Sequence, residues 1–134
     1  MSFEILVGTW ENEERRHMPE RTIRERFARH IVGKDKFGEW LLAFTEGPGQ
    51  SLLSATTYRS GFSVRNPPDY LEFWKVVAGF LRDFPCVLYW PGGGAVVGRL
   101  DMLAHLPKGM VETLGVPWVS ADPERIRRYV WENS

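Results

Sequence analysis

The carboxy-terminal half of the chain constrains the fold most, because its segments follow in an order typical of a compact α/β module. A helix is predicted to begin near Asp69, and a buried strand follows at Cys86–Trp90. Three glycines at 92–94 turn the chain, two short helical pieces follow, and a last strand is expected at 118–120. Asp122-Pro123 has the residue types that open a terminal helix. This order specifies a layered module without placing a recognisable catalytic set on it.

The amino-terminal half contains one predicted helix. Thr22 and Glu25 have the spacing of a capping box, in which a hydroxyl and a carboxylate satisfy free amides at a helix start. An apolar stripe at i, i+4 and i+8 follows (Ile23, Phe27 and Ile31). Gly33 suits the left-handed position that closes a helix, so the pattern predicts a helix from Thr22 to about Gly33.

Short apolar and β-branched runs predict the strands of one sheet. In this half they are residues 3–7, 40–44, 51–58 and 61–64, with a turn at Gly47-Pro48-Gly49 and a solvated loop at 11–16. The helix that begins near Asp69 is apolar on nearly all sides, which predicts that it packs on two sides or is covered by a partner. We therefore expect a single α+β domain over residues 1–134. Its sheet is expected to be mainly antiparallel or mixed, with about five strands and packed helices.

Composition and charge narrow the class of protein. The 134 residues hold 17 basic and 17 acidic side chains, whereas nucleic-acid binders usually carry a basic excess or stripe. The single cysteine, Cys86, excludes an intramolecular disulfide and fits a reducing compartment. The segment at 1–4 lacks signal-peptide features, and no apolar run approaches the roughly 18 residues of a membrane span. We expect a soluble cytoplasmic protein that binds neither nucleic acid nor membrane, and the oligomeric state stays open.

Catalytic motifs are weak throughout the sequence. The glycines at 92–94 lack the lysine and hydroxyl residue of a phosphate loop, and the apolar run after them predicts a strand, so we interpret them as a hairpin turn. Cys86 lies in an apolar strand where a thiol ionises poorly, which makes a Cys86–His105 pair an unfavourable nucleophile and base. The three histidines have no metal-ligand spacing. The sequence therefore predicts no catalytic residues, no cofactor and no metal.

Aromatic residues carry the remaining functional signal. Six Trp, four Tyr and eight Phe exceed what a core of this size obviously needs, and Trp and Tyr are enriched at interface hot spots. We selected aromatic and charged side chains beside predicted loops and strand ends. The candidate partner-binding residues are Trp10, Glu13, Glu14, Tyr58, Arg59 and Trp90.

Four segments of the carboxy-terminal half together resemble a known group of proteins. They are Phe73-Trp74, Leu88-Tyr89-Trp90-Pro91-Gly92-Gly93, His105-Leu106-Pro107 and Asp122-Pro123-Glu124-Arg125-Ile126. They resemble the small bacterial immunity proteins encoded beside polymorphic or contact-dependent toxins. The resemblance implies a cytoplasmic single-domain protein that binds and blocks a cognate toxin or effector domain, without a cofactor. The neutral charge departs from the acidic character of many nuclease inhibitors.

Two alternatives to toxin inhibition remain at this point. One is a small hydrolase or transferase that uses polar residues such as His105, Asp101 and Glu46. The other is a secretion adaptor or chaperone that binds an effector without inhibiting it. Stoichiometric inhibition by occupancy, without enzymatic activity, is the function that the sequence favours.

Overall fold

The secondary-structure elements come from a computed structural model that describes residues 3–44 and 52–134. The strands are β1 (Glu4–Glu11), β2 (Glu14–Arg15), β3 (Ile31–Lys34), β4 (Trp40–Ala43), β5 (Leu52–Tyr58), β6 (Gly61–Arg65), β7 (Cys86–Tyr89), β8 (Ala95–Val97) and β9 (Trp118–Val119). The helices are α1 (Glu20–Phe27), α2 (Leu71–Asp83), α3 (Lys108–Leu114) and α4 (Pro123–Glu132), with 3-10 turns η1 (Ala28–His30) and η2 (Leu100–His105). The predicted turn at Gly47-Pro48-Gly49 lies outside the described residues.

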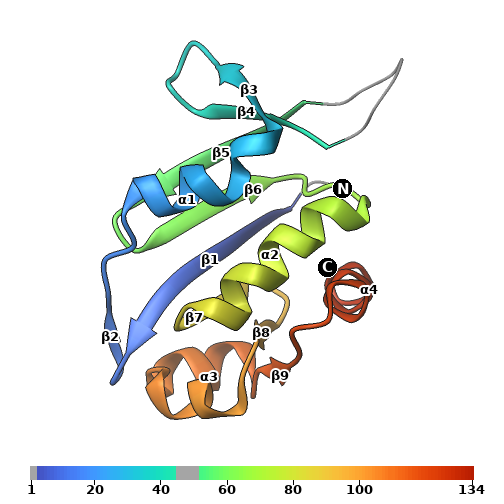
Figure 1. Cartoon of the computed structure of the whole chain (residues 1–134). Coiled ribbons are helices and arrows are strands. Elements are labelled where there is room, and N and C mark those ends of the chain that lie inside the picture. Colours follow the sequence, from blue (N-terminus) through green and yellow to red (C-terminus); the bar gives the residue numbers. More distant parts are fainter. Residues whose placement is uncertain (1–2, 45–51) are drawn as a thin grey trace.

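One mixed sheet organises the domain (Figure 1). Its strand order is β3-β4-β5-β6-β1-β7-β8-β9, and β2 forms a hairpin with β1. Neighbouring strands are antiparallel except β8 and β9, which are parallel. The expected α+β class and mostly antiparallel sheet are confirmed, but about five strands was too few, since nine occur among the described residues. The strands that the sequence did not predict are β2, which lies in the stretch expected to be a solvated loop, and β3, which lies where the first helix was expected to continue. Both are defined by their pairing partners, β1 and β4, more than by local sequence.

Helix α1 differs from its prediction at both ends. It begins at Glu20 after Pro19, no side chain caps it, and the capping box predicted from Thr22 and Glu25 is wrong. Glu25 instead pairs with Arg21 at 3.0 Å along the helix surface. The helix ends at Phe27, and the chain enters edge strand β3, which pairs with β4. The β-branched pair Ile31-Val32 favours a strand, so pairing with β4 ends the apolar helical pattern early.

Helix α2 packs on two sides, as its apolar surface predicted. It packs against the sheet and against α4, and Phe73, Trp74 and Phe80 are fully buried in the main core (Figure 1). Trp74 Nε1 donates a hydrogen bond of 2.8 Å to the carbonyl oxygen of Pro68, which fixes the indole inside the core. The terminal helix α4 begins as expected, because Asp122 Oδ1 accepts a 2.9 Å hydrogen bond from the amide of Arg125.

The glycine run at 92–94 forms the turn of the β7–β8 hairpin, which confirms the hairpin interpretation. Gly92 has φ of 74°, a left-handed conformation that favours glycine. A Cβ at Gly93 would lie 1.4 Å from Nε1 of Trp90, so this glycine allows the turn to close on the indole. None of the helices among residues 3–44 and 52–134 has the length and apolar character needed to cross a bilayer.

The two faces of the sheet are covered unequally. On one face, α1, α2 and α4 contribute to the main core. On the other face, alternate residues of β7 and β8 (Val87, Ala95 and Val97) pack with Met102 and Leu106 around η2. Strands β7 and β8 are therefore buried on both sides. The second face of β4, β5, β6 and β1 carries half-buried and polar side chains instead, and we call it the open face.

Candidate functional site

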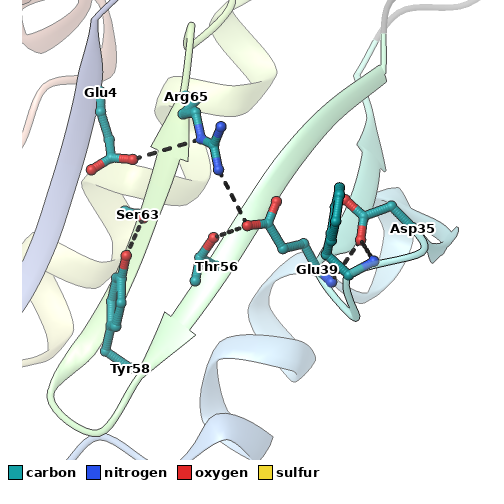
Figure 2. Close-up of polar contacts among 8 residues, drawn as sticks. Glu4, Asp35, Glu39, Thr56, Tyr58, Ser63 and Arg65 are labelled. Carbon is teal, nitrogen blue, oxygen red and sulfur yellow. Dashed lines mark hydrogen bonds and ion pairs between the residues drawn. The ribbon is translucent and has the colours of Figure 1, made fainter.

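A chain of polar side chains crosses the open face from β1 to β4 (Figure 2). Arg65 lies between two carboxylates, with Nε 4.0 Å from Glu4 and Nη2 3.4 Å from Glu39. Glu39 also accepts a 2.8 Å hydrogen bond from the Thr56 hydroxyl. Further along the same face, Tyr58 and Ser63 share a hydrogen bond of 3.2 Å between their hydroxyls. This end of the open face is internally paired, so its charges largely satisfy one another.

Two hairpins meet at the other end of the open face. The β1–β2 turn is made by Asn12 and Glu13, which have φ of 52° and 66° and match the left-handed turn that suits a two-residue hairpin. The chain after β2 then runs beside the β5–β6 turn, because the amide of Met18 donates to the carbonyl of Arg59 at 2.8 Å. The amide of Thr9 donates to Ser60 at the same distance. These bonds join β1 and the chain after β2 to the β5–β6 turn, so the side chains of these segments share one surface.

A pocket of about 340 Å³ lies where these hairpins meet. Its floor includes Leu6, Gly8 and Gly61, and Tyr58 and Tyr89 flank it. Gly8 and Gly61 are opposite each other in the β1–β6 register, and neither has a side chain to fill the sheet surface. The pocket is therefore a hollow in the sheet between two tyrosines, where the missing side chain of Gly8 leaves space.

Three arginines line this pocket, and no carboxylate lines it among the described residues. The guanidinium of Arg15 lies 5.3 Å from the centre of the Trp10 ring, close enough for cation–π attraction. Arg16 has only long, exposed ion pairs, at 3.8 Å to Glu11 and 3.9 Å to Glu14. Arg15 and Arg59 form no ion pair with any residue of 3–44 or 52–134. The pocket thus has a local positive charge in a chain of zero net charge.

The two tyrosines supply hydrogen-bonding groups to the pocket. Burial raises the pKa of Tyr89, and the nearby charge of Arg15 opposes this only in part. Tyr89 therefore remains a neutral phenol at physiological pH. Tyr58 is 49% exposed at the end of β5, with its ring on the same surface. Each phenol can donate a hydrogen bond as well as present an apolar ring face.

Four of the six candidate partner-binding residues lie near this pocket. Tyr58 and Arg59 line it, and Trp10 contacts the guanidinium of Arg15 at its edge. Glu14 is exposed and lies 3.9 Å from Arg16, which also lines the pocket. Glu13 is exposed in the β1–β2 turn but faces η2 and α3, where it lines a second pocket. These residues were predicted separately, from aromatic or charged character, and the fold brings four of them together at one end of the open face.

The sixth candidate, Trp90, is a correction. It is 1% exposed and belongs to the main core, so a partner has no access to it. Its Nε1 donates a hydrogen bond of 3.1 Å to the carbonyl oxygen of Asn133, and its ring contacts Tyr129 edge-on. The chain after α4 covers this end of the strand. The prediction that Trp90 is exposed because it lies at a strand end is therefore wrong.

The residues considered for the enzyme alternative have structural partners. His105 Nδ1 accepts a 3.0 Å hydrogen bond from the amide of Asn12, which ties η2 to the β1–β2 turn. Asp101 is exposed and lies 3.5 Å from Arg99. Glu46 falls outside the described residues. No group of three His, Cys, Asp or Glu side chains comes together as a metal site in the part of the chain that the structure describes.

Sequence reasoning missed the residues that shape the pocket, namely Gly8, Gly61, Arg15, Arg16 and Tyr89. Gly8 could have been recognised from the sequence, because a glycine inside a β-branched run marks a close approach or a gap in a strand. No sequence signal marked the arginines, since they lie in a stretch of mixed charge.

Comparisons of the chain with protein-family models, with curated proteins and with solved structures found no match.

Proposed function

We propose that this protein acts as an immunity protein, which binds a cognate bacterial toxin or effector domain and blocks it by occupancy. The observation that supports the proposal most is the open face with its pocket of tyrosines and arginines. Tyrosine, tryptophan and arginine are the side chains most enriched at the energetic centres of protein interfaces. Function by occupancy requires such a surface and does not require a reacting group.

Uneven coverage of the sheet also supports a binding role for the open face. The same face is closed by η2 and α3 over β7 and β8, whereas no helix among residues 3–44 and 52–134 covers it over β4, β5, β6 and β1. The arginines of the pocket supply local charge complementarity for an acidic patch on the partner. Because the net charge is zero, we expect specificity from this local charge and little long-range steering.

Stoichiometry separates inhibition from the alternatives. The protein is co-expressed with the product of the neighbouring gene, and the complex is isolated and titrated in an activity assay of that product. We expect a stable complex and full inhibition at equimolar protein, over an interface of about 1,600 Å² in total. Protection at far substoichiometric amounts would instead indicate turnover and the enzyme alternative. A complex that leaves the partner active would indicate an adaptor or chaperone.

A pair of matched variants tests the position of the interface. Arg59 and Arg24 are both exposed arginines, but Arg59 lines the pocket whereas Arg24 lies on α1, which packs on the opposite face. Arg59→Ala should weaken the complex about tenfold or more, the effect of losing roughly 1.4 kcal/mol. Arg24→Ala should leave the affinity unchanged. Equal effects of both substitutions would place the interface elsewhere.

A further inference from the structure

The charges of the pocket determine what kind of group it can bind. Arg15, Arg16 and Arg59 line it, and no acidic side chain among the described residues lines it with them. Arg15 and Arg59 form no ion pair with any described residue, and Arg16 has only long, exposed pairs with Glu11 and Glu14. Such guanidinium groups at a concave surface favour an anion, and a planar guanidinium fits the two oxygens of a carboxylate. The hydroxyl groups of Tyr58 and Tyr89 can donate further hydrogen bonds to the same anion.

The rest of the pocket is apolar and small. Leu6, the two glycines and the ring faces of the tyrosines offer surface for hydrocarbon more than for water. A volume of about 340 Å³ is at the lower end of the range for small-molecule sites and is sufficient for one or two side chains. A carboxylate attached to an apolar neighbour would fit both the arginines and this floor.

We propose that the pocket receives an acidic side chain of the partner protein, next to an aromatic or aliphatic residue of the same partner segment. The inference deepens and rests on the proposed function, because it names the chemistry recognised at the same surface. A protein segment is the favoured source of the carboxylate for a geometric reason. The pocket lies on the open face and is bordered by the β5–β6 turn and by Arg15 and Arg16, so an extended segment lying on the face can insert one side chain into it.

The experiment uses the protein alone and three probes, followed by amide chemical shifts in NMR titrations. The first probe is the blocked peptide acetyl-Phe-Glu-Phe-amide, and the second is its Gln counterpart. The third is 3-phenylpropionate, a free organic acid with the same two groups. We expect saturable shifts at Gly8, Ser60 and Gly61 with the Glu peptide, and affinity about tenfold lower with the Gln peptide. The affinity should also fall as salt is raised from about 0.1 M to about 0.5 M.

Two arginine variants test whether the peptide binds in the pocket. Arg59→Gln should lower the affinity for the Glu peptide about tenfold, whereas Arg24→Gln should not change it. Preserved shift dispersion in both variants shows that the fold is intact, so a loss of binding then reports on the site.

Three results would overturn the inference. They are equal affinity for the Glu and Gln peptides, tighter binding of 3-phenylpropionate than of the Glu peptide, and shifts that lie away from the pocket. Tighter binding of the free acid would identify a small-molecule site. Failure here is distinguishable from failure of the proposed function, because the complex with the neighbouring gene product is measured separately. A stable inhibitory complex without peptide binding removes this inference alone.

Discussion

Gly8 of β1 and Gly61 of β6 lie opposite each other in the sheet, yet they tolerate a side chain very differently. A Cβ at Gly8 would lie 3.7 Å from Trp10 Nε1 and 4.0 Å from Tyr89 Cε1, which is ordinary van der Waals contact. A Cβ at Gly61 would lie 1.8 Å from the carbonyl oxygen of Val7, which no strand backbone accommodates unchanged. The fold requires glycine at position 61, whereas at position 8 glycine leaves space for the pocket.

This contrast predicts separate effects on stability and binding. Gly8→Val places two methyl groups in the pocket and should change the unfolding free energy by less than about 1 kcal/mol. It should abolish binding of the Glu peptide and weaken the partner complex. Gly61→Ala should cost about 3 kcal/mol or more, because β1 and β6 must separate. Urea unfolding and the peptide titration measure the two effects. Unchanged peptide affinity in a folded Gly8→Val variant would contradict the position of the site.

Trp74 should contribute strongly to stability. It is fully buried in the main core, and its indole also donates to the carbonyl oxygen of Pro68. Trp74→Ala should lower the unfolding free energy by about 3–5 kcal/mol. Trp131 on α4 is 42% exposed, so Trp131→Ala serves as a control and should cost less than about 1 kcal/mol. A loss below about 1 kcal/mol for Trp74→Ala in urea unfolding would show that α2 contributes little to the core.

Local sequence predicted the elements whose chemistry is local. Asp122-Pro123 opens α4 through its own side chain, the continuous apolar run of β7 is buried on both faces, and the glycines at 92–94 make a hairpin turn. In each case the residues that determine the structure are adjacent in the chain. The predicted type of each of these three elements was correct because no distant segment of the chain competes with the local preference.

Contacts between residues far apart in the chain determine the features that could not be predicted from the sequence. Ile31 continues the stripe of α1 but lies in β3, because β4 supplies a pairing partner for the edge strand. Trp90 is buried because the carbonyl of Asn133, 43 residues later, reaches its indole. The pocket depends on the register that places Gly8 opposite Gly61, and on the backbone hydrogen bonds that join β1 and the chain after β2 to the β5–β6 turn. Neither residue spacing nor composition encodes such pairings.

Asp83 should make stability depend on acid pH. Hydrogen bonds from Arg82 and from Arg26 hold the pKa of its carboxyl well below the usual value, and the bond from Arg26 at 2.7 Å links α1 to α2. The ionised form therefore stabilises the fold above the unfolded pKa of about 4, and this contribution is lost as the pH falls below it. Asp83→Asn should lower stability at neutral pH and reduce the further loss in acid.

Urea unfolding across pH measures this effect of Asp83. Asp101, an exposed aspartate paired with Arg99 at 3.5 Å, provides the control. Asp101→Asn should retain the wild-type dependence on pH. Parallel curves for wild type and Asp83→Asn below about pH 4 would show that the interhelical ion pair adds nothing to stability.

Cys86 should be inert in the native state and should affect stability at alkaline pH. The side chain is fully buried, and burial raises the pKa of its thiol to about 12, although the nearby Thr9 hydroxyl at 3.7 Å acts in the opposite direction. A thiol reagent at neutral pH should therefore label the protein only as fast as it unfolds. Rapid labelling of the native protein would contradict this prediction.

The alkaline effect of Cys86 has a definite sign. Above an unfolded pKa of about 9, the unfolded thiol loses its proton while the folded one retains it, so the unfolded state binds fewer protons. Stability should then fall by up to about 1.4 kcal/mol per pH unit between about pH 9 and pH 12. Cys86→Ala removes the ionising group, so the variant should lose this part of the dependence of stability on pH. Tyrosines and lysines that titrate in the same range affect both proteins alike. Unfolding free energies of wild type and Cys86→Ala at a series of pH values measure the difference. A difference that stays constant from about pH 8 to pH 11 would show that the thiol ionises equally in both states.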